Sequence, residues 1–519
     1  MTIFGTTGPS DPVVGDHVVT PLPTAFVCDG CGFRAPDDAP VPMRCPEAVP
    51  DDDIDHVLVR TLDPERLAFP KGTEPNPYVR YRALTHGAHV ASALGWRDAD
   101  VVAMVDRLDK AVARVDGHGF VVTPLLAADR AALALGLEGE LLVKDETRNV
   151  AGSHKARHLM GTALELDVAE ALERSHLDHR VPDPPARSAP LAIASCGNAA
   201  LAAAVIARAW GRELLVFVPT DADHIVVDRL RRLEAIVTVA ERTAGVPGDP
   251  TYHLLRGAID DGAIPFTCQG NENGLAIEGG ETLGYELVTD LIATGRRLDR
   301  LVIQVGGGAL ASSCTRAFDD AHALGAIDRL PRIHAVQSPG AAPLVRAYDL
   351  VADRLSRRLG LGPIAGTAGS RSLHERAAAA ERLRGAVAEP AAVDELSWIV
   401  RHRSTVMWPW EAVPQSVAGG ILDDETYDWF AIVGSMLRTG GYPVTASEKT
   451  LLEANRLGRA TTGIDVDHTG SAGLAGLMAL RRAGLVDAAE TVAVLFTGVR
   501  RDPSPTPTAH SRPAQGEPR

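Results

Sequence analysis

A lysine stands at the end of a polar turn in the segment LLVKDETRNVAGSHKARHLMG, residues 141–161. The apolar start predicts a strand, and the end predicts a helix that begins near Gly152-Ser153-His154-Lys155. At the start of a helix the backbone dipole disfavours a charged ammonium group, which favours a neutral, nucleophilic amine on Lys155. By itself this lysine is more simply explained as an ordinary surface residue, because most lysines are exposed and have no catalytic role.

Two further turns carry polar groups directly after apolar runs. Ser195-Cys196-Gly197-Asn198-Ala199 follows LAIA, and its small residues allow backbone amides to approach an anion such as a carboxylate. A plain strand-to-helix turn capped by Asn198 explains the pattern equally well. Thr497 ends the run TVAVLF, where its hydroxyl could bond a ring nitrogen, although a β-branched residue is also typical of a buried strand.

A glycine run, Gly306-Gly307-Gly308, separates the apolar run LVIQV from a helical segment that begins at Ala309-Leu310. Glycines lack a Cβ, so three in succession can turn several N–H groups towards a phosphate at a helix start. The spacing G-x-G-x-x-G of a dinucleotide site is absent, and a tight turn explains a lone glycine run about as well. The run therefore indicates a phosphate site only in combination with other motifs.

Short apolar or β-branched runs alternate with segments of helical length from about residue 120 onwards. Seven such runs predict strands: GELLVKDE, APLAIASC, ELLVFVP, AIVTVA, RLVIQVGGG, RIHAVQS and TVAVLFTG. Their alternation with helices predicts right-handed crossovers, a mostly parallel sheet and an α/β fold. Each of the motifs above comes directly after a strand, and ligands of open α/β sheets bind at the carboxyl ends of the strands.

The chain of 519 residues exceeds the roughly 250–300 residues of a single hydrophobic core, which predicts several domains. Residues 1–115 are interpreted as an N-terminal extension that contains a cysteine segment and a helix over RDADVVAMVDRLDKAVARV. The segments 177–190 and 359–372 are rich in proline or glycine and are expected to be exposed. Residues 502–519 are rich in proline and are expected to form a disordered tail.

Acidic residues outnumber basic ones, 67 Asp+Glu against 52 Lys+Arg, and the formal net charge is -15. Such a balance repels the phosphates of nucleic acids, which we exclude as partners.

The sequence has no apolar run of the roughly 18–20 residues that span a membrane and no signal-peptide pattern, so a cytoplasmic protein without membrane contact is expected. Six cysteines are too few for a disulfide scaffold in so long a chain, and we expect reduced thiols.

The joint order of the motifs is more specific than any one of them. A lysine after a strand, then S-x-G-N, a triple glycine and a final T-G resembles the fold-type II pyridoxal-phosphate (PLP) enzymes of the tryptophan-synthase-β-like superfamily, in particular their threonine-synthase and threonine-dehydratase branch. The resemblance covers about residues 120–500. Further matching segments are Thr123-Pro124-Leu125, EGGETLGYEL from Glu278, VQSPGAAPLVRA from Val336, SVAGGI from Ser416 and DHTGSAGLAGL from Asp467.

The resemblance implies two three-layer αβα domains with mostly parallel sheets. The large PLP-binding domain would comprise residues 116–160 and 265–501, and the small domain residues 161–264. Members of this family are commonly homodimers, and by analogy we expect a homodimer that acts on a small amino acid.

The resemblance also assigns a role to each motif. Lys155 would be the catalytic residue and carry PLP as a Schiff base, and Asn198 would hydrogen-bond the phenolic oxygen of PLP. Thr497 would face the pyridine nitrogen. The phosphate would be bound by Gly306, Gly307, Gly308, Ala309 and Leu310, and the substrate carboxylate by Ser195, Gly197 and Ala199. A neutral hydroxyl, unlike an aspartate, does not keep the ring nitrogen protonated, which favours elimination and replacement over transamination.

The implied activity is that of a carbon–oxygen lyase or synthase similar to threonine synthase, with β- or γ-elimination or replacement on a small amino acid. The lysine motif departs from the usual Gly-Ser-Phe-Lys-Asp-Arg of threonine synthases, because His154 and Ala156 replace the phenylalanine and the aspartate. Three alternatives stay open: a serine or threonine ammonia-lyase, a β-replacement synthase of a specialised pathway, and a retired subunit that uses the fold for protein contacts. Retention of all four motifs argues against the retired subunit.

Three cysteines near the N-terminus lie in Cys28-Asp29-Gly30-Cys31 and Cys45-Pro46, which resemble the zinc-ribbon-like cysteine pairs of some threonine-synthase relatives. A closed structural zinc site needs four ligands, and Ala48 stands where a fourth cysteine would be. Either another residue such as His56 completes the site or the site has decayed. A partial or decayed site is the favoured interpretation, because no fourth ligand has the usual short spacing, and bound zinc is the less favoured one.

Overall fold

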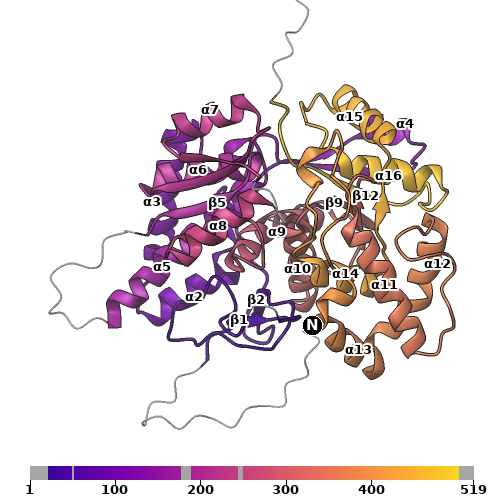
Figure 1. The fold of residues 1–519 in the computed structure, drawn as a ribbon, viewed down its shortest axis with the longest axis horizontal. Helices are drawn as coiled ribbons and strands as arrows, with labels where there is room; N and C mark the ends of the chain where they lie inside the picture. Colours follow the sequence, from indigo (N-terminus) through magenta and orange to yellow (C-terminus); the bar gives the residue numbers. More distant parts are fainter. Residues whose placement is uncertain (1–20, 50–51, 177–188, 243–248, 502–519) are drawn as a thin grey trace, which may run out of the picture.

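Two lobes, each built around its own sheet, lie side by side in the computed structural model (Figure 1). The structure describes residues 21–49, 52–176, 189–242 and 249–501. The predicted tail 502–519 and most of the predicted loop 177–190 lie outside the described residues. The other predicted loop, 359–372, joins two helices and has no helix or strand of its own.

The larger sheet has six strands in the order β11-β10-β9-β12-β4-β3. Their bounds are β3 Leu125–Ala127, β4 Leu141–Asp145, β9 Arg300–Gln304, β10 Arg332–Gln337, β11 Val444–Thr445 and β12 Val492–Phe496. All neighbouring pairs are parallel except β3 with β4, and Val492 of β12 lies opposite both Leu141 and Arg300. The strands β4, β9 and β12 are buried along their whole length, which explains their mainly apolar sequences.

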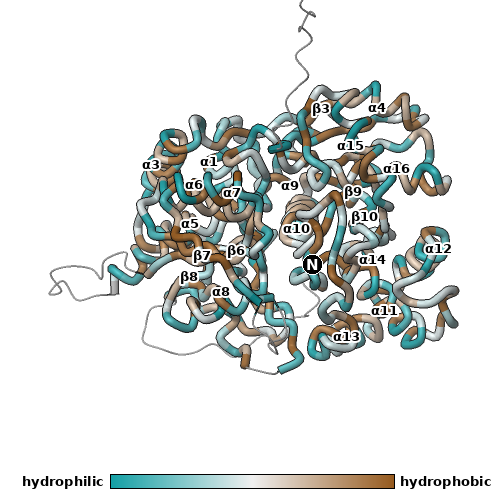
Figure 2. Tube along the Cα trace, turned by 45° about the horizontal axis from the view of Figure 1, so that its top comes forward, coloured by the Kyte–Doolittle hydropathy of each residue, from teal (hydrophilic) through white to brown (hydrophobic). Residues whose placement is uncertain are grey.

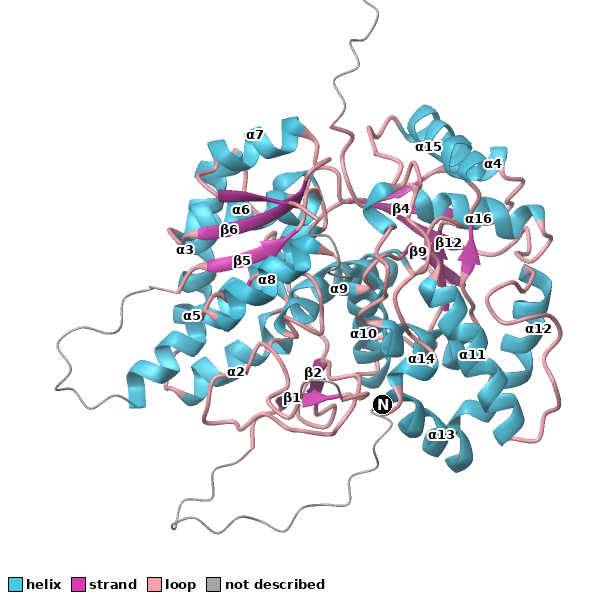
Figure 3. Ribbon diagram, in the orientation of Figure 1, coloured by secondary structure: helices cyan, strands magenta, loops and turns pink. Residues whose placement is uncertain are grey.

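Helices surround this sheet and join its strands (Figure 3). They are α4 Asp129–Ala134, α9 Leu275–Thr294, α10 Ala309–Ala323, α11 Pro343–Arg358, α12 Leu373–Leu383, α13 Pro390–Val400, α14 Trp429–Thr439, α15 Glu448–Thr462 and α16 Ala472–Arg482. Helix α9 is buried from Leu275 to Val288, because it packs between α10 and a helix of the other lobe, α5 (Lys155–His176). A Cβ at Gly279 would lie 2.6 Å from the carbonyl oxygen of Arg157, so glycine at this position lets α9 approach α5 closely.

The smaller sheet has four parallel strands in the order β7-β6-β5-β8. Its elements besides α5 are β5 Leu191–Ala194, α6 Asn198–Trp210, β6 Leu214–Pro219, α7 His224–Arg232, β7 Ile236–Ala240, α8 Pro250–Asp260 and β8 Ile264–Pro265. Two earlier helices, α2 (His86–Ala93) and α3 (Asp98–Asp116), pack on α5 and α6. The apolar side of α3 therefore belongs to the same hydrophobic core as β5 and β6, although it comes from the segment interpreted as an N-terminal extension.

An antiparallel pair of strands, β1 (Thr24–Cys28) and β2 (Leu58–Leu62), lies below the two lobes in Figure 1 and contacts α9. The short helix α1 (Pro77–Arg80) follows β2 along the chain. In the part of the chain that the structure describes, no helix combines the length and the apolar character needed to cross a membrane.

The predicted secondary structure agrees with this architecture. The seven predicted strands correspond to β4, β5, β6, β7, β9, β10 and β12, and the predicted helix at residues 97–115 corresponds to α3. Figure 2 shows β6 and β9 mainly as hydrophobic segments, as expected of strands that form the centre of a core. The prediction of an α/β fold with mostly parallel sheets is confirmed.

Candidate active site

The carboxyl ends of three strands meet at one edge of the larger sheet. Strand β12 lies between β4 and β9, and the three are parallel, so the segments that follow them leave the sheet at the same edge. Lys155 follows β4, the glycine loop (Gly306–Gly308) follows β9, and Thr497 follows β12 directly. The fold therefore brings three of the predicted motifs together.

Lys155 is the first residue of α5, and the segment before it is tied to the end of β12. Ser153 pairs with Gly498 in an antiparallel bridge, and the His154 N–H donates to the Thr497 carbonyl at 3.1 Å. The preceding turn is left-handed, with φ of 55° at Ala151, a conformation that is costly for a residue with a Cβ. Strain of this kind at the start of the lysine helix is typical of a functional site.

Two carboxyl groups interact electrostatically with the half-buried Lys155, that of the half-buried Asp423 and that of the buried Asp428. Burial and then the charge of Asp55 raise the pKa of Asp428 to about 8, although the charges of Arg316 and Lys155 oppose this rise. Burial also raises the pKa of Asp423. Within the described residues neither carboxyl oxygen of Asp428 has a hydrogen-bond partner, which agrees with its preference for the neutral form.

Two histidines beside Lys155 stay neutral. His154 and His158 pack edge to face with ring centroids 5.7 Å apart. Burial, followed by the charge of Lys155, lowers the pKa of both, to about 3 for His158. The His158 imidazole bonds the Ala276 carbonyl at 2.8 Å through Nδ1, which ties the lysine helix to α9. These rings therefore add no positive charge next to the lysine.

The glycine loop has the geometry of an anion site. Gly308 has a φ of 109°, which only glycine adopts easily, and it is followed by the N-terminus of α10. A Cβ at Gly307 would lie 2.9 Å from the Tyr427 ring, and a Cβ at Gly308 would lie 3.0 Å from Asp428 Cβ, so the loop has no room for larger residues. Glycines at the N-terminus of a helix leave backbone N–H groups accessible, and such groups fit a phosphate.

The hydroxyl of Thr497 is buried and oriented by Gln304. The Gln304 Nε2 donates to Thr497 Oγ1 at 2.7 Å. Because this bond uses a lone pair of the oxygen, the hydroxyl proton remains free to donate to another acceptor, such as a ring nitrogen.

Asn198 reaches the same edge from the smaller lobe. It is the first residue of α6, and a Cβ at Gly498 would lie 2.7 Å from Asn198 Nδ2. The guanidinium of Arg501 donates to Asn198 Oδ1 and to the Ala151 carbonyl. Arg501 thus joins the S-x-G-N turn to the turn before Lys155, and the pKa of Arg501 is lowered to about 10, first by burial and then by the charge of Arg229.

The remaining predicted contacts lie close by. Ser195 and Gly197 lie in the half-buried turn between β5 and α6, where the Gly197 N–H donates to Ser195 Oγ at 3.4 Å, and Ala199 is in the first turn of α6. A Cβ at Gly197 would meet no atom within 4 Å, so the turn borders open space beside Asn198. Ala309 and Leu310 form the buried first turn of α10. Their predicted roles in substrate and phosphate binding stay predictions.

A buried ionic network lies beside Lys155, and sequence reasoning missed it. Arg157 donates to Glu146 at 2.8 Å and to Glu286 at 2.6 Å, and Lys144 pairs with Glu286 at 2.8 Å. Burial would raise the pKa of Glu286, but the charges of Arg157 and Lys144 outweigh it, and the pKa is lowered. The network joins β4, α5 and α9, and so it fixes the position at which the lysine helix begins.

Four residues of the edge, Gln304, Asp423, Asp428 and Arg501, are also absent from the sequence prediction. Gln304 could have been identified from the sequence, because it is the one polar residue in the apolar run LVIQV. The two aspartates belong to the acidic run LDDETYD, which closely follows SVAGGI.

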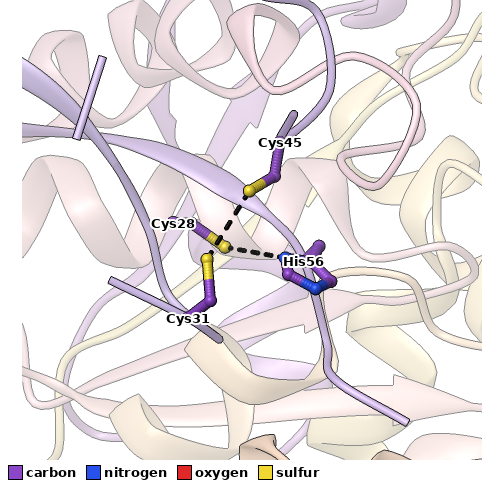
Figure 4. Close-up of side chains that lie close together, drawn as sticks. All are labelled: Cys28, Cys31, Cys45 and His56. Atoms are coloured by element: carbon purple, nitrogen blue, oxygen red, sulfur yellow. Dashed lines mark hydrogen bonds between the residues drawn. The ribbon is translucent and has the colours of Figure 1, made fainter. Parts of the chain in front are cut away.

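A second cluster of polar side chains lies at the N-terminal strand pair (Figure 4). The donor atoms of Cys28, Cys31, Cys45 and His56 all lie within 4.8 Å of one another. The structure therefore supplies a fourth donor, which is the arrangement of the less favoured alternative, whereas bound zinc stays a prediction. The segment before β2 returns alongside Cys28 and brings His56 to the three sulfurs, which local spacing in the sequence does not reveal.

Comparisons with known proteins agree with the geometry of the edge. Residues 118–383 match the family model described as pyridoxal-phosphate dependent enzyme. The chain belongs to this family. PLP is therefore its cofactor, and the predictions of an enzyme, of PLP and of fold type II are confirmed. Enzymes of this family act on small amino-acid substrates.

Curated threonine synthases are similar to the chain over most of its length. The threonine synthase of Methanocaldococcus jannaschii is 23% identical over 405 residues, which is 78% of this chain and 79% of that protein. That of Mycobacterium tuberculosis is 24% identical over 379 residues, or 72% of this chain and 80% of that protein. Among solved structures, a diaminopropionate ammonia lyase from Escherichia coli shares the fold with a TM-score of 0.51 and 17% identity, over 77% of this chain and 88% of that one.

Proposed function

We propose that the protein is a PLP-dependent lyase or synthase similar to threonine synthase, which performs β- or γ-elimination or replacement on a small hydroxy or phosphorylated amino acid. The observation that carries this proposal is the meeting of Lys155, the glycine loop, Thr497 and Asn198 at one edge of the larger sheet. Threonine synthases that match 78% and 73% of the chain support the reaction type.

The residues of this edge fit PLP. The glycine loop would hold the phosphate through its N–H groups, Thr497 would face the ring nitrogen, and Asn198 would bond the phenolic oxygen. Lys155 would carry the cofactor as a Schiff base. When bound, the cofactor withdraws electrons from the Cα of an amino acid.

The chain's own groups would then direct the reaction. The amine of Lys155 would take the proton from the substrate Cα and return a proton to the product. The Thr497 hydroxyl is neutral and held by the neutral amide of Gln304, so it does not stabilise a proton on the ring nitrogen. This arrangement favours loss or exchange of a group at Cβ or Cγ over transamination.

A serine or threonine ammonia-lyase is the second candidate. His154 and Ala156 stand where threonine synthases usually have phenylalanine and aspartate. His154 is buried, with Nδ1 3.2 Å from the Thr497 carbonyl, so this substitution changes a side chain directly at the edge. Because His154 and Ala156 differ from the threonine-synthase motif, a β-replacement synthase is a third candidate.

Product analysis distinguishes these reactions. The purified holoenzyme is incubated separately with phosphohomoserine, threonine and serine, and phosphate, ammonia and 2-oxo acids are measured. Release of phosphate with formation of threonine supports the proposal, whereas ammonia and a 2-oxo acid from serine or threonine would select the ammonia-lyase. Absence of any product, together with a cofactor spectrum that no amino acid changes, would contradict both and support a retired subunit.

We further propose that the enzyme is a cytoplasmic homodimer. All six cysteines are free thiols in the structure, as is usual in a reducing compartment, and homodimers are common among the enzymes that the chain resembles. Light scattering during gel filtration should give twice the mass of the chain, and a monomeric mass would contradict the dimer. Recovery of the protein with the membrane or secreted fraction of cells would contradict the location.

A further inference from the structure

The donor atoms of Cys28, Cys31, Cys45 and His56 have the spacing of a tetrahedral zinc site (Figure 4). Cys28 Sγ lies 3.5 Å from His56 Nδ1, and Cys31 Sγ lies 3.6 Å from Cys45 Sγ. A tetrahedron with Zn–S bonds of about 2.3 Å and Zn–N bonds of about 2.0 Å has S–S edges of about 3.8 Å and S–N edges of about 3.5 Å. We propose that these four residues bind one Zn²⁺ in a closed structural site.

The backbone around the first two cysteines is shaped to hold these donors. The Gly32 N–H donates to the Cys28 carbonyl at 3.0 Å, and the Phe33 N–H donates to Cys31 Sγ at 3.4 Å. Gly32 has a φ of 81°, which glycine adopts easily. A Cβ at Gly30 would lie 2.7 Å from Ile54 Cγ2, so glycine there lets the segment that carries His56 come close.

His56 is oriented by a carboxylate on its other nitrogen. Its Nε2 lies 3.1 Å from Asp52 Oδ2, and the two carboxyl oxygens of Asp52 accept the N–H groups of Val49 and Ile54, each at 3.1 Å. A carboxylate in this position keeps the proton on Nε2 and makes Nδ1 a better ligand. Nδ1 is the nitrogen that faces Cys28.

The four ligands are typical of zinc and of a structural site. Three thiolates and an imidazole suit Zn²⁺ and not the oxygen-binding ions Mg²⁺ and Ca²⁺. Four protein ligands fill the tetrahedron, so no position is left for a substrate. The buried core of this segment is also small, comprising Phe26, Cys28, Ala35, Cys45, Leu58 and Leu275. A metal ion commonly replaces the missing hydrophobic core in segments of this size.

The proposed site is attached to the helices next to the active-site edge. Asp29 accepts a hydrogen bond from Arg316 of α10 at 2.8 Å, and Asp55, beside His56, accepts one from Arg403 at 3.1 Å. The Gly274 N–H, just before α9, donates to the Met43 carbonyl at 3.0 Å. Zinc would therefore hold the N-terminal segment against α9 and α10, and α10 begins at the glycine loop.

Metal analysis of the wild-type holoenzyme tests the proposal first. Protein prepared without oxygen, from cells supplied with zinc, should keep a single Zn²⁺ per chain through gel filtration. X-ray absorption at the zinc edge should show three sulfur ligands and one nitrogen ligand. Protein without zinc under these conditions, or zinc bound mainly by oxygen, would overturn the proposal.

Variants test the ligand set. Cys31→Ser and His56→Ala should lose the zinc, whereas His56→Cys should keep it, because a fourth thiolate also closes the tetrahedron. Cys196→Ser, at an exposed thiol outside the cluster, serves as the control for metal content and should bind zinc like the wild type. Wild-type zinc content in both Cys31→Ser and His56→Ala would overturn the assignment. If these variants do not fold, the absorption spectrum of the wild type still decides.

Removal of the metal tests the structural role. A strong chelator should lower the Tm of the wild type by about 4 °C or more, and added Zn²⁺ should restore it. Thiol counting should show three additional reactive thiols after chelation. An unchanged Tm in protein shown to have lost its zinc would refute the structural role, and a Cys31–Cys45 disulfide in the zinc-free protein as isolated would refute the site.

Discussion

The edge of the larger sheet and the N-terminal cysteine segment hold their functional groups by different means. At the edge, parallel strands buried along their whole length position Lys155, the glycine loop and Thr497. Between β1 and β2 the described residues form no helix or further strand and share a core of few side chains. A large sheet can thus position side chains by packing alone, whereas the cysteine segment would hold its donors through the proposed zinc ion.

The largest effect at the edge is expected from Lys155→Ala. Loss of the amine would remove the proposed proton transfer at Cα, so kcat should fall by about 10³-fold or more, and the half-buried position should leave the core intact. Steady-state kinetics with the best substrate and a thermal melt measure both quantities. Lys449→Ala, at an exposed lysine of α15, should behave like the wild type. A Lys155→Ala variant that retains activity would contradict the assignment.

The buried ion pairs next to the edge can be broken by a substitution of Arg157. Arg157→Met leaves Glu146 and Glu286 buried without their main partner, which should lower the free energy of unfolding by about 3–5 kcal/mol. Denaturant titration measures the loss. Arg97→Met, which breaks an exposed pair with Asp100, should leave the free energy of unfolding nearly unchanged. Equal effects of the two variants would show that the buried network does not stabilise the edge.

Much of the fold and part of the site follow from the sequence. The strands are evident because continuous apolar runs between helical segments are typical of buried parallel strands, and the motifs at their ends meet because β4, β9 and β12 are neighbours. The sequence offers His56 only as one possible fourth ligand, and it does not reveal the network around Arg157 at all. Their partners come from segments far apart in the chain, and no local periodicity or spacing encodes such contacts.

Asp428 should make the stability of the protein depend on pH. Its pKa rises from 3.8 to about 8 on folding, so between these values the folded state holds a proton that the unfolded state has lost. Stability should therefore fall as the pH rises through this window.

Asp428→Asn should remove this loss of stability at higher pH. The Tm of the variant should decline less than that of the wild type between about pH 5 and about pH 9, with a difference of several degrees that is largest above pH 8. Asp228→Asn, at an exposed carboxyl of α7, should keep the wild-type slope. Parallel curves for Asp428→Asn and the wild type would rule out a neutral Asp428.

The smallest effect is expected at Thr497. Thr497→Ala would remove the proposed hydrogen bond to the ring nitrogen and should lower kcat by about 10-fold, whereas Thr497→Ser keeps the hydroxyl and should stay within about 3-fold of the wild type. The two variants are compared by kcat and by the visible spectrum of the bound cofactor. Indistinguishable values for alanine and serine at this position would argue against a contact with the ring.

The most direct test of the central claim is to locate the cofactor on the chain. The holoenzyme is reduced with borohydride and digested, and the peptides are analysed by mass spectrometry. The visible band of PLP should disappear, and the reduced cofactor should be attached to Lys155. Attachment to another lysine, or no attachment in protein saturated with PLP, would contradict it.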